Sequence, residues 1–131
     1  MLKSRLWVQV TAVALLCAGC VGPLKDYNPI NLMRGKGSPE LSAGIKSYDE
    51  GEYAEAQKSL LSALDQGLAF KSDQVKAHKY LAFIYCISNK EKQCRDEFKK
   101  ALEIDPDFEL EPAEAGHPQW GPVFRSVKTK K

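Results

Sequence analysis

Four cysteines are the residues of this chain whose type and spacing most clearly indicate chemistry. They are Cys17 and Cys20 near the N-terminus and Cys86 and Cys94 in the second half. A thiol can accept an acyl chain, form a disulfide or bind a metal as the thiolate. Because the chain has only two histidines, a zinc cluster is not expected, and no metal or cofactor is predicted.

Motifs for catalysis are not found in the sequence. No serine or cysteine lies in a recognisable nucleophile motif, and there is neither a glycine-rich phosphate loop nor metal-ligand spacing. Glu50, Glu52 and Glu55 crowd one predicted helix end, a pattern typical of solvated charge. We therefore expect a protein that is not an enzyme.

A short apolar stretch precedes the second cysteine. Lys3 and Arg5 are followed by an apolar run from Leu6 to Leu16 and then by Ala18-Gly19-Cys20. The run has about 11 residues, whereas a membrane-spanning helix needs about 20. The arrangement resembles the signal of bacterial lipoproteins. This resemblance implies that residues 1–19 are a signal peptide and that Cys20 carries a covalent lipid, a diacylglycerol with acyl chains such as palmitate.

The match to the lipoprotein signal is incomplete. Leu16 lies one place too far upstream, and Cys17 stands where leucine is usual. The alternative is an ordinary secretory signal in which Cys20 occurs by chance. Val21 replaces the aspartate that would resemble an inner-membrane retention signal. The resemblance therefore implies an outer-membrane lipoprotein that faces the periplasm of a Gram-negative bacterium.

Charge and length limit the partners and the number of domains. The formal net charge is +2, and loss of Lys3 and Arg5 with the signal peptide leaves a neutral chain. A nucleic-acid-binding protein usually carries a basic excess, so no nucleic-acid partner is expected. The chain that remains after the signal peptide is long enough for one small domain, and a second domain is not expected.

A tether and four helices are predicted after the signal peptide. Residues 20–37 contain prolines and glycines without helical or strand periodicity, which predicts a flexible tether. The Ser38 hydroxyl is expected to cap a helix that starts with Pro39. Helices are predicted at about 39–50, 53–66, 73–88 and 91–103, with breaks at Gly51, Gly67 and Asn89 and an end at Pro106.

The predicted helices contain an internal repeat. Ala56, Leu60 and Ala63 recur as Cys94, Phe98 and Ala101, and the offset between the two copies is the same for all three pairs. The same register includes Gly44 and Tyr53 in the first copy and Leu81, Ala82, Tyr85 and Pro106 in the second. This pattern resembles the tetratricopeptide repeat, although the usual period of that repeat is slightly shorter. The resemblance implies an all-α fold: two tetratricopeptide-like antiparallel hairpins, about 38–70 and 75–108, in a domain of residues 38–128. A generic pair of helical hairpins is the alternative.

An apolar segment follows the second repeat. Two repeats are fewer than the three that usually bury a continuous core. Trp120, Val123, Phe124 and Val127 are therefore predicted to form a capping helix in the segment 117–128. The alternative is that Trp120 and Phe124 are exposed anchors for a partner.

The tetratricopeptide resemblance also implies a binding site. Such proteins bind peptides or helices in a concave groove lined by the first helix of each hairpin. By register, the groove would contain Leu41, Ile45, Tyr48 and Asp49 from the first copy and Lys76, Lys79, Phe83 and Cys86 from the second. Such an apolar surface with a basic edge suits a segment that carries acidic residues. Packing against a neighbouring helix or the C-terminal segment is the alternative at each position.

The second cysteine pair predicts a disulfide. Cys86 lies near the end of one predicted helix and Cys94 near the start of the next, and an oxidising periplasm favours a bond between them. The tetratricopeptide register argues against it, because it directs Cys86 to the groove and Cys94 to the hairpin interior. A bridge needs Cα atoms within about 7 Å.

A narrower resemblance concerns function. It rests on residues 79–86, Cys94, residues 98–108 and the sequence Gly-His-Pro-Gln-Trp-Gly-Pro-Val-Phe at 116–124. These segments resemble small tetratricopeptide lipoproteins associated with type VI secretion. This resemblance implies an accessory lipoprotein that helps to place a secretion apparatus at the envelope through protein contacts. The alternatives are a pilotin-like or outer-membrane assembly lipoprotein and a structural spacer or homo-oligomer.

Overall fold

The structure is a computed structural model that describes residues 29, 33 and 35–129. The predicted signal peptide, Cys20 and most of the predicted tether lie outside the described residues. The helices of the described part are α2 (Ser38–Asp49), α3 (Tyr53–Gln66), α4 (Lys71–Ile87), α5 (Glu91–Ile104), α6 (Pro112–Ala115) and α7 (Trp120–Lys128). This part contains no strand, so the predicted all-α class is confirmed.

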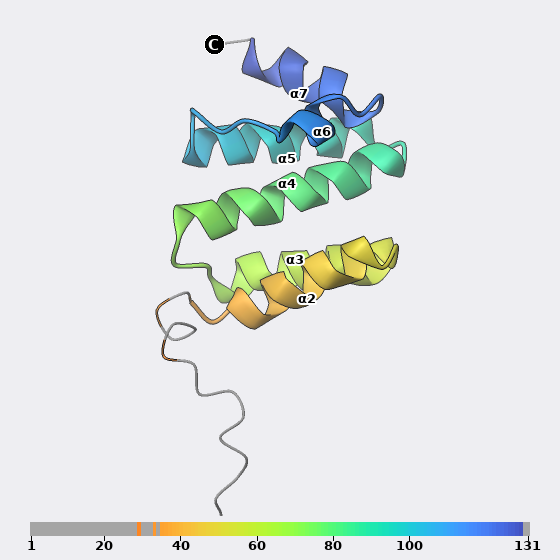
Figure 1. Ribbon diagram of the computed structural model, residues 1–131. Coiled ribbons are helices and arrows are strands. Elements are labelled where there is room, and N and C mark those ends of the chain that lie inside the picture. The colour runs from red at the N-terminus through yellow and green to blue at the C-terminus, as the bar shows by residue number, and fades with distance from the viewer. Residues whose placement is uncertain (1–28, 30–32, 34, 130–131) are drawn as a thin grey trace, which may run out of the picture.

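The helices stack in chain order from α2 and α3 at one end to α7 at the other (Figure 1). Helix α2 packs along α3 and α4 packs along α5, so the chain forms two consecutive hairpins. Helix α4 also contacts the first hairpin, and α7 lies against α5. The short helix α6 sits in the strap that connects α5 to α7 (Figure 1).

The helix boundaries repeat at the offset found in the sequence. Helix α3 runs from Tyr53 to Gln66 and α5 from Glu91 to Ile104, so both ends are displaced by the same offset that separates Ala56 from Cys94. The equivalent residues at the hairpin interiors are all fully buried: Ala56 and Cys94, Leu60 and Phe98, Ala63 and Ala101. The hydrophobic period of the sequence therefore corresponds to two hairpins with equivalent buried positions.

Small residues let the paired helices approach one another. A Cβ atom on Gly44 would lie 2.8 Å from the Leu60 Cγ, so a larger residue would force α2 away from α3. The equivalent residue in the second hairpin is Ala82, which is fully buried. These contacts explain why glycine and alanine recur at this position of the repeat.

The two hairpin turns use the same left-handed backbone conformation. Gly51 has a φ of 80°, and Asn89, its equivalent in the second copy, has a φ of 59°. Asparagine is among the few side-chain-bearing residues that adopt this region at low cost. Asn89 therefore replaces the turn glycine without changing the geometry of the hairpin.

The start of α2 differs from the prediction, because the N-cap residue is Gly37 and no side chain caps the helix. The Gly37 amide donates to the Gly67 carbonyl at 3.0 Å, and a Cβ on Gly37 would lie only 2.0 Å from the Ala63 carbonyl oxygen. Ser38 is instead the first residue of the helix and is buried. Close packing on the end of α3 thus selects glycine at the cap. The packed region begins at Gly35, inside the end of the predicted tether.

Helix α4 is longer than its counterpart in the first hairpin. It begins at Lys71, whereas the position equivalent to Ser38 is Lys76. The additional residues of the second repeat therefore extend the helix. Gln74 stabilises this extra turn by donating from Nε2 to the Leu68 carbonyl at 2.7 Å.

A buried carboxylate with two hydrogen-bond partners links the helices of the second hairpin. His78 on α4 donates from Nδ1 to the Glu97 Oε2 at 2.6 Å, and Lys100 donates to the Glu97 Oε1 at 2.7 Å. Burial raises the pKa of the Glu97 carboxyl, but the hydrogen bonds from His78 and Lys100 outweigh burial and leave the pKa below its usual value. The carboxylate is therefore charged at neutral pH and compensated by two partners.

Candidate functional site

The residues predicted to line a binding groove fall into a buried group and an accessible group. Leu41, Phe83 and Cys86 are only 5%, 2% and 7% exposed, because each packs into one of the two core clusters. The prediction that these three side chains line an open groove is therefore wrong. Ile45 and Tyr48 are partly exposed, and Lys76 is exposed.

The C-terminal segment covers the second half of the predicted groove. The Trp120 ring stacks on Phe83 with centroids 4.2 Å apart, and its indole Nε1 donates to the Glu114 carbonyl at 2.8 Å. On its other side, Trp120 stacks on the His117 ring at 3.3 Å. Trp120 is thus held between α4 and the loop that precedes α7.

The capping prediction for the C-terminal helix is confirmed. Trp120 and Phe124 are 7% and 3% exposed, and Phe124 packs edge-to-face on Phe98 with centroids 5.1 Å apart. Val123 is also buried and Val127 is partly buried. Because their rings lie inside the protein, Trp120 and Phe124 are not exposed anchors for a partner.

The basic edge predicted for the groove is smaller than expected. Lys79 donates from Nζ to the Glu114 Oε1 at 2.6 Å, and both side chains are largely buried at this bond. Its positive charge is therefore compensated within the chain. Lys76 remains as the exposed cation of the predicted set.

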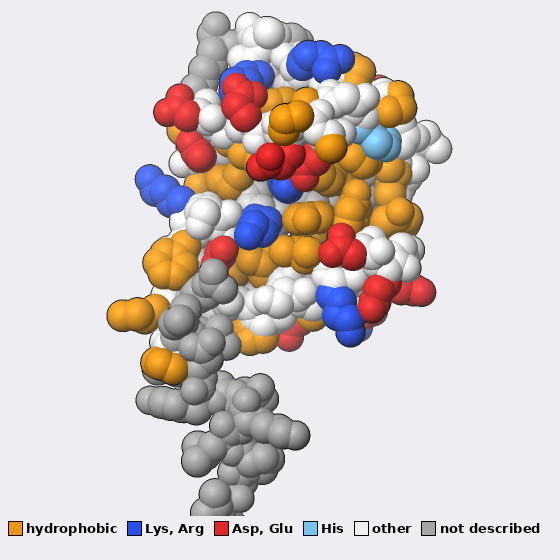
Figure 2. Space-filling view, viewed as in Figure 1, with side chains coloured by type: hydrophobic (Ala, Val, Ile, Leu, Met, Phe, Trp, Pro, Cys, Tyr) orange, Lys and Arg blue, Asp and Glu red, His pale blue; other side chains and the backbone are white. Residues whose placement is uncertain are grey.

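A cluster of tyrosines remains accessible on the same face. We define the tyrosine face as Ile45, Tyr48, Tyr53 and Tyr80, which come from α2, the start of α3 and α4. The Tyr48 ring centroid lies 4.9 Å from that of Tyr80 and 5.6 Å from that of Tyr53. Figure 2 shows hydrophobic side chains gathered in a band over α4, between α2 and α6. The rings of Tyr48 and Tyr80 also contact Phe83, so the tyrosine face rests on the buried core.

The hydroxyls of Tyr48 and Tyr80 are uncharged at physiological pH. Burial, followed by the neighbouring Tyr53, raises the pKa of Tyr48 to about 12. Burial, followed by the carboxylate of Asp49, also raises the pKa of Tyr80. Within the described residues, no hydrogen bond joins these hydroxyls to another protein group. The face therefore offers flat apolar rings together with neutral hydroxyl groups that can donate or accept hydrogen bonds.

Two members of the tyrosine face, Tyr53 and Tyr80, were not among the groove residues predicted from the sequence. Tyr80 follows Lys76 by one helical turn and therefore shares its side of α4, a periodicity that could have identified it. Tyr53 is recognisable as a repeat residue, but its 42% exposure beside Tyr48 depends on the turn at Gly51. Local spacing alone does not reveal that approach.

The predicted disulfide between Cys86 and Cys94 is confirmed, with the two Cα atoms 5.2 Å apart. Both cysteines are buried, so the objection drawn from the repeat register does not hold. The bond joins the end of α4 to the start of α5 beside the Asn89 turn. It lies in the same core cluster as Phe83 and Trp120 and therefore reinforces the hairpin that carries part of the tyrosine face.

Among residues 35–129 and the two described residues before them, no group of three or more histidine, cysteine, aspartate or glutamate side chains is arranged to hold a metal ion. None of the helices described is both long enough and apolar enough to cross a membrane.

Comparisons of the chain with protein-family models, with curated proteins and with solved structures find no match.

Proposed function

We propose that this chain is a non-enzymatic, lipid-anchored adaptor of the bacterial cell envelope that holds another protein on the tyrosine face. The observation that carries the proposal is the accessibility of Tyr48 and Tyr80 on the first helices of two repeated hairpins. The neighbouring part of the same face is closed by Trp120. An accessible aromatic surface of this kind, next to the part of the face that Trp120 covers, is a suitable docking site for one side of a helix or an extended segment.

The repeat supports the tetratricopeptide part of the proposal. Both hairpins have the same turn conformation and the same buried positions at the constant offset of the repeat. Two such hairpins present their first helices side by side, which is the arrangement that this class of repeat uses to bind protein segments. The tyrosine face lies mainly on these helices.

The N-terminal sequence supports the anchor and the location. Lys3, Arg5, the apolar run and Ala18-Gly19-Cys20 favour export and lipidation, and Val21 favours the outer membrane. With the resemblance of residues 79–86 and 116–124 to type VI secretion lipoproteins, these features favour an accessory role in that apparatus, on the periplasmic side of the outer membrane.

Crosslinking from the tyrosine face tests the docking role. A photoreactive phenylalanine analogue at Tyr48, in the native bacterium, is expected to crosslink to a membrane-core component of a type VI secretion apparatus. The same analogue at Leu61, which is 43% exposed on α3, is the matched control. Equal crosslinking from Leu61 would refute the tyrosine face as the docking site. Crosslinks to a secretin or outer-membrane barrel would favour the assembly role, and crosslinks only to copies of the chain would favour the spacer.

Fractionation tests the anchor separately. Cys20→Ala is expected to abolish incorporation of labelled palmitate and to move the protein from the membrane fraction to the soluble periplasmic fraction. Cys17→Leu removes the neighbouring thiol and introduces the leucine that is usual at this position of the signal, so it is the matched control and should leave both unchanged. An unchanged membrane fraction for Cys20→Ala would remove the lipid anchor without affecting the docking role.

A further inference from the structure

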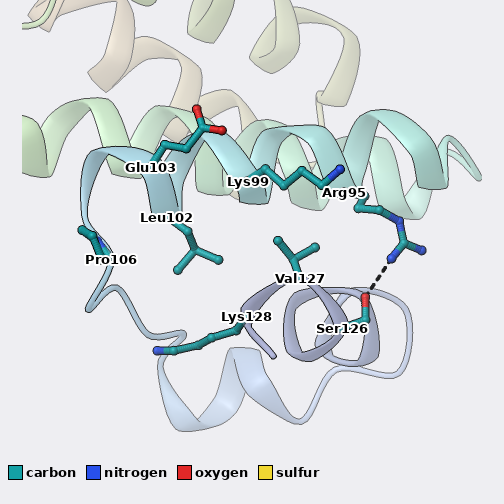
Figure 3. A pocket seen from close by; sticks show the side chains of 8 residues that line it. All are labelled: Arg95, Lys99, Leu102, Glu103, Pro106, Ser126, Val127 and Lys128. Atoms are coloured by element: carbon teal, nitrogen blue, oxygen red, sulfur yellow. Dashed lines mark hydrogen bonds between the residues drawn. The ribbon is translucent and has the colours of Figure 1, made fainter. Parts of the chain in front are cut away.

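A second surface lies at the α7 end of the helical stack, away from α2 and α3 (Figure 1). It is a groove of about 510 Å³ between α5 and α7 (Figure 3). Leu102 on α5 and Val127 on α7 point toward one another across it, and Pro106 closes one side. The volume is typical of sites that bind small ligands or a few side chains of a protein segment.

The rim of this groove is cationic. Arg95, Lys99 and Lys128 contribute to the lining, whereas Glu103 is the one carboxylate among the lining residues. Figure 3 shows the Glu103 side chain directed away from α7 and from the space between Leu102 and Val127. Lys128 already pairs with Glu109 and donates to the Phe108 carbonyl, so Arg95 and Lys99 are the rim cations that face a partner. The groove therefore combines an apolar floor with a cationic edge, although the mature chain as a whole is expected to be neutral.

The rim cations can exchange their present partners. Lys99 is 52% exposed, and its Nζ lies 3.9 Å from the Asp96 carboxylate. Arg95 donates to the Ser126 hydroxyl at 2.8 Å and pairs with Glu91 on the same helix. The Lys99–Asp96 pair is exposed, and exposed pairs contribute only about 0–1 kcal/mol. The Arg95 side chain is 31% exposed, and its guanidinium group has more N–H donors than its two present partners use. A carboxylate brought in by a partner can therefore replace or join them at little cost.

We propose that the groove between α5 and α7 docks an acidic amphipathic segment of a second protein. An apolar side chain of that segment lies between Leu102 and Val127, and its carboxylates pair with Arg95 and Lys99. Charge complementarity favours this occupant over a basic or a purely apolar one. The groove shares no residue with the tyrosine face, so the proposal is independent of the proposed function.

Titration with designed peptides tests the proposal. The probe is a helical peptide of about four turns with leucine on one side and glutamate on the other, added to the purified chain and followed by methyl NMR. We expect saturable shifts of the Leu102 and Val127 methyl signals, with binding weakened about tenfold when salt is raised from about 50 to 300 mM. Two comparison peptides, one with lysine for glutamate and one with serine for leucine, should bind much more weakly.

Two charge-reversal variants locate the site. Lys99→Glu is expected to weaken binding of the glutamate–leucine peptide about tenfold, because it replaces attraction at the rim by repulsion. Lys58→Glu makes the same change at an exposed lysine of α3 outside the groove and should leave binding unchanged. Both positions are exposed on helices, so circular dichroism should show two folded proteins.

Several outcomes would overturn the proposal. One is the absence of methyl shifts at Leu102 and Val127. Another is that the lysine–leucine peptide binds as tightly as the glutamate–leucine peptide. A third is that Lys58→Glu weakens binding of the glutamate–leucine peptide as much as Lys99→Glu does. Shifts caused by vesicles of phosphatidylglycerol, without any caused by the peptide, would assign the groove to a membrane surface. Shifts that follow protein concentration alone would assign it to a second copy of the chain.

Discussion

Lys79 on α4 donates a hydrogen bond to the carboxylate of Glu114 at 2.6 Å, which joins two residues that are 35 positions apart. The backbone carbonyl of Glu114 accepts the indole hydrogen bond of Trp120. A single residue of the strap therefore fixes α6 against α4 and orients the ring that covers Phe83. This arrangement closes one part of the predicted groove and leaves the tyrosine face accessible.

Trp120→Ala is expected to lower the free energy of unfolding by about 3–5 kcal/mol, because it removes the ring stacked on Phe83 and leaves a cavity in the core. Urea unfolding followed by circular dichroism measures the loss. Leu61→Ala is the matched control, since Leu61 is 43% exposed and its truncation should cost less than about 1 kcal/mol. Similar stability of the two variants would mean that α7 does not cap the core.

Gly37→Ala is expected to destabilise the protein by about 1–3 kcal/mol, because the added Cβ would lie 2.0 Å from the Ala63 carbonyl oxygen and α2 would have to move. Gly116→Ala provides the control, since its nearest neighbour would be the Pro112 carbonyl oxygen at 3.8 Å. Thermal unfolding should show a lower midpoint for Gly37→Ala than for Gly116→Ala. The reverse order would contradict the close packing at the start of α2.

Reduction of the Cys86–Cys94 bond is expected to lower the free energy of unfolding by about 2–3 kcal/mol, as the bond closes a loop with a sequence separation of only 8. Urea unfolding with and without dithiothreitol measures this difference. The double variant Cys86→Ala, Cys94→Ala should be insensitive to dithiothreitol. An equal response of the double variant would show that the reductant acts elsewhere.

The Glu97 carboxylate and its two partners predict a pH dependence of stability. The folded-state pKa of Glu97 lies below 4.5, since the hydrogen bonds from His78 and Lys100 outweigh burial. A carboxyl with a lowered pKa binds fewer protons when folded, so its stabilising contribution is present above about pH 4.5 and is lost as the pH falls through the lower folded value.

Glu97→Gln removes this titrating group from the α4–α5 interface. We expect a loss of about 1–3 kcal/mol at pH 7 and a shallower fall in stability below pH 4.5 than in the wild type. Glu55→Gln is the control, because Glu55 is 60% exposed and only pairs with Lys58 at 3.9 Å. If the free energy of unfolding of the wild type and of Glu97→Gln fell in parallel below pH 4.5, titration of Glu97 would be excluded as the cause of the fall.

The local pattern of the sequence was sufficient to predict the hairpins. Apolar residues at helical spacing and breaks at Gly51 and Asn89 locate α3 and α5 closely, because helix formation and turn geometry depend on neighbouring residues. The short separation of Cys86 and Cys94 likewise made their bond predictable. The capping helix followed from the need to cover two repeats.

Long-range packing decided which surfaces stay accessible. Phe83 is buried because Trp120 stacks on it, and Lys79 is compensated because Glu114 reaches it from the strap. Glycine is required at position 37 because the chain returns to Ala63, a contact that no local pattern contains. The sequence by itself therefore determined the four hairpin helices, the capping helix and the repeat, whereas the short helix α6 was not predicted. Only the tertiary structure determined the tyrosine face and the groove between α5 and α7, since residues far apart in the chain cover or expose these side chains.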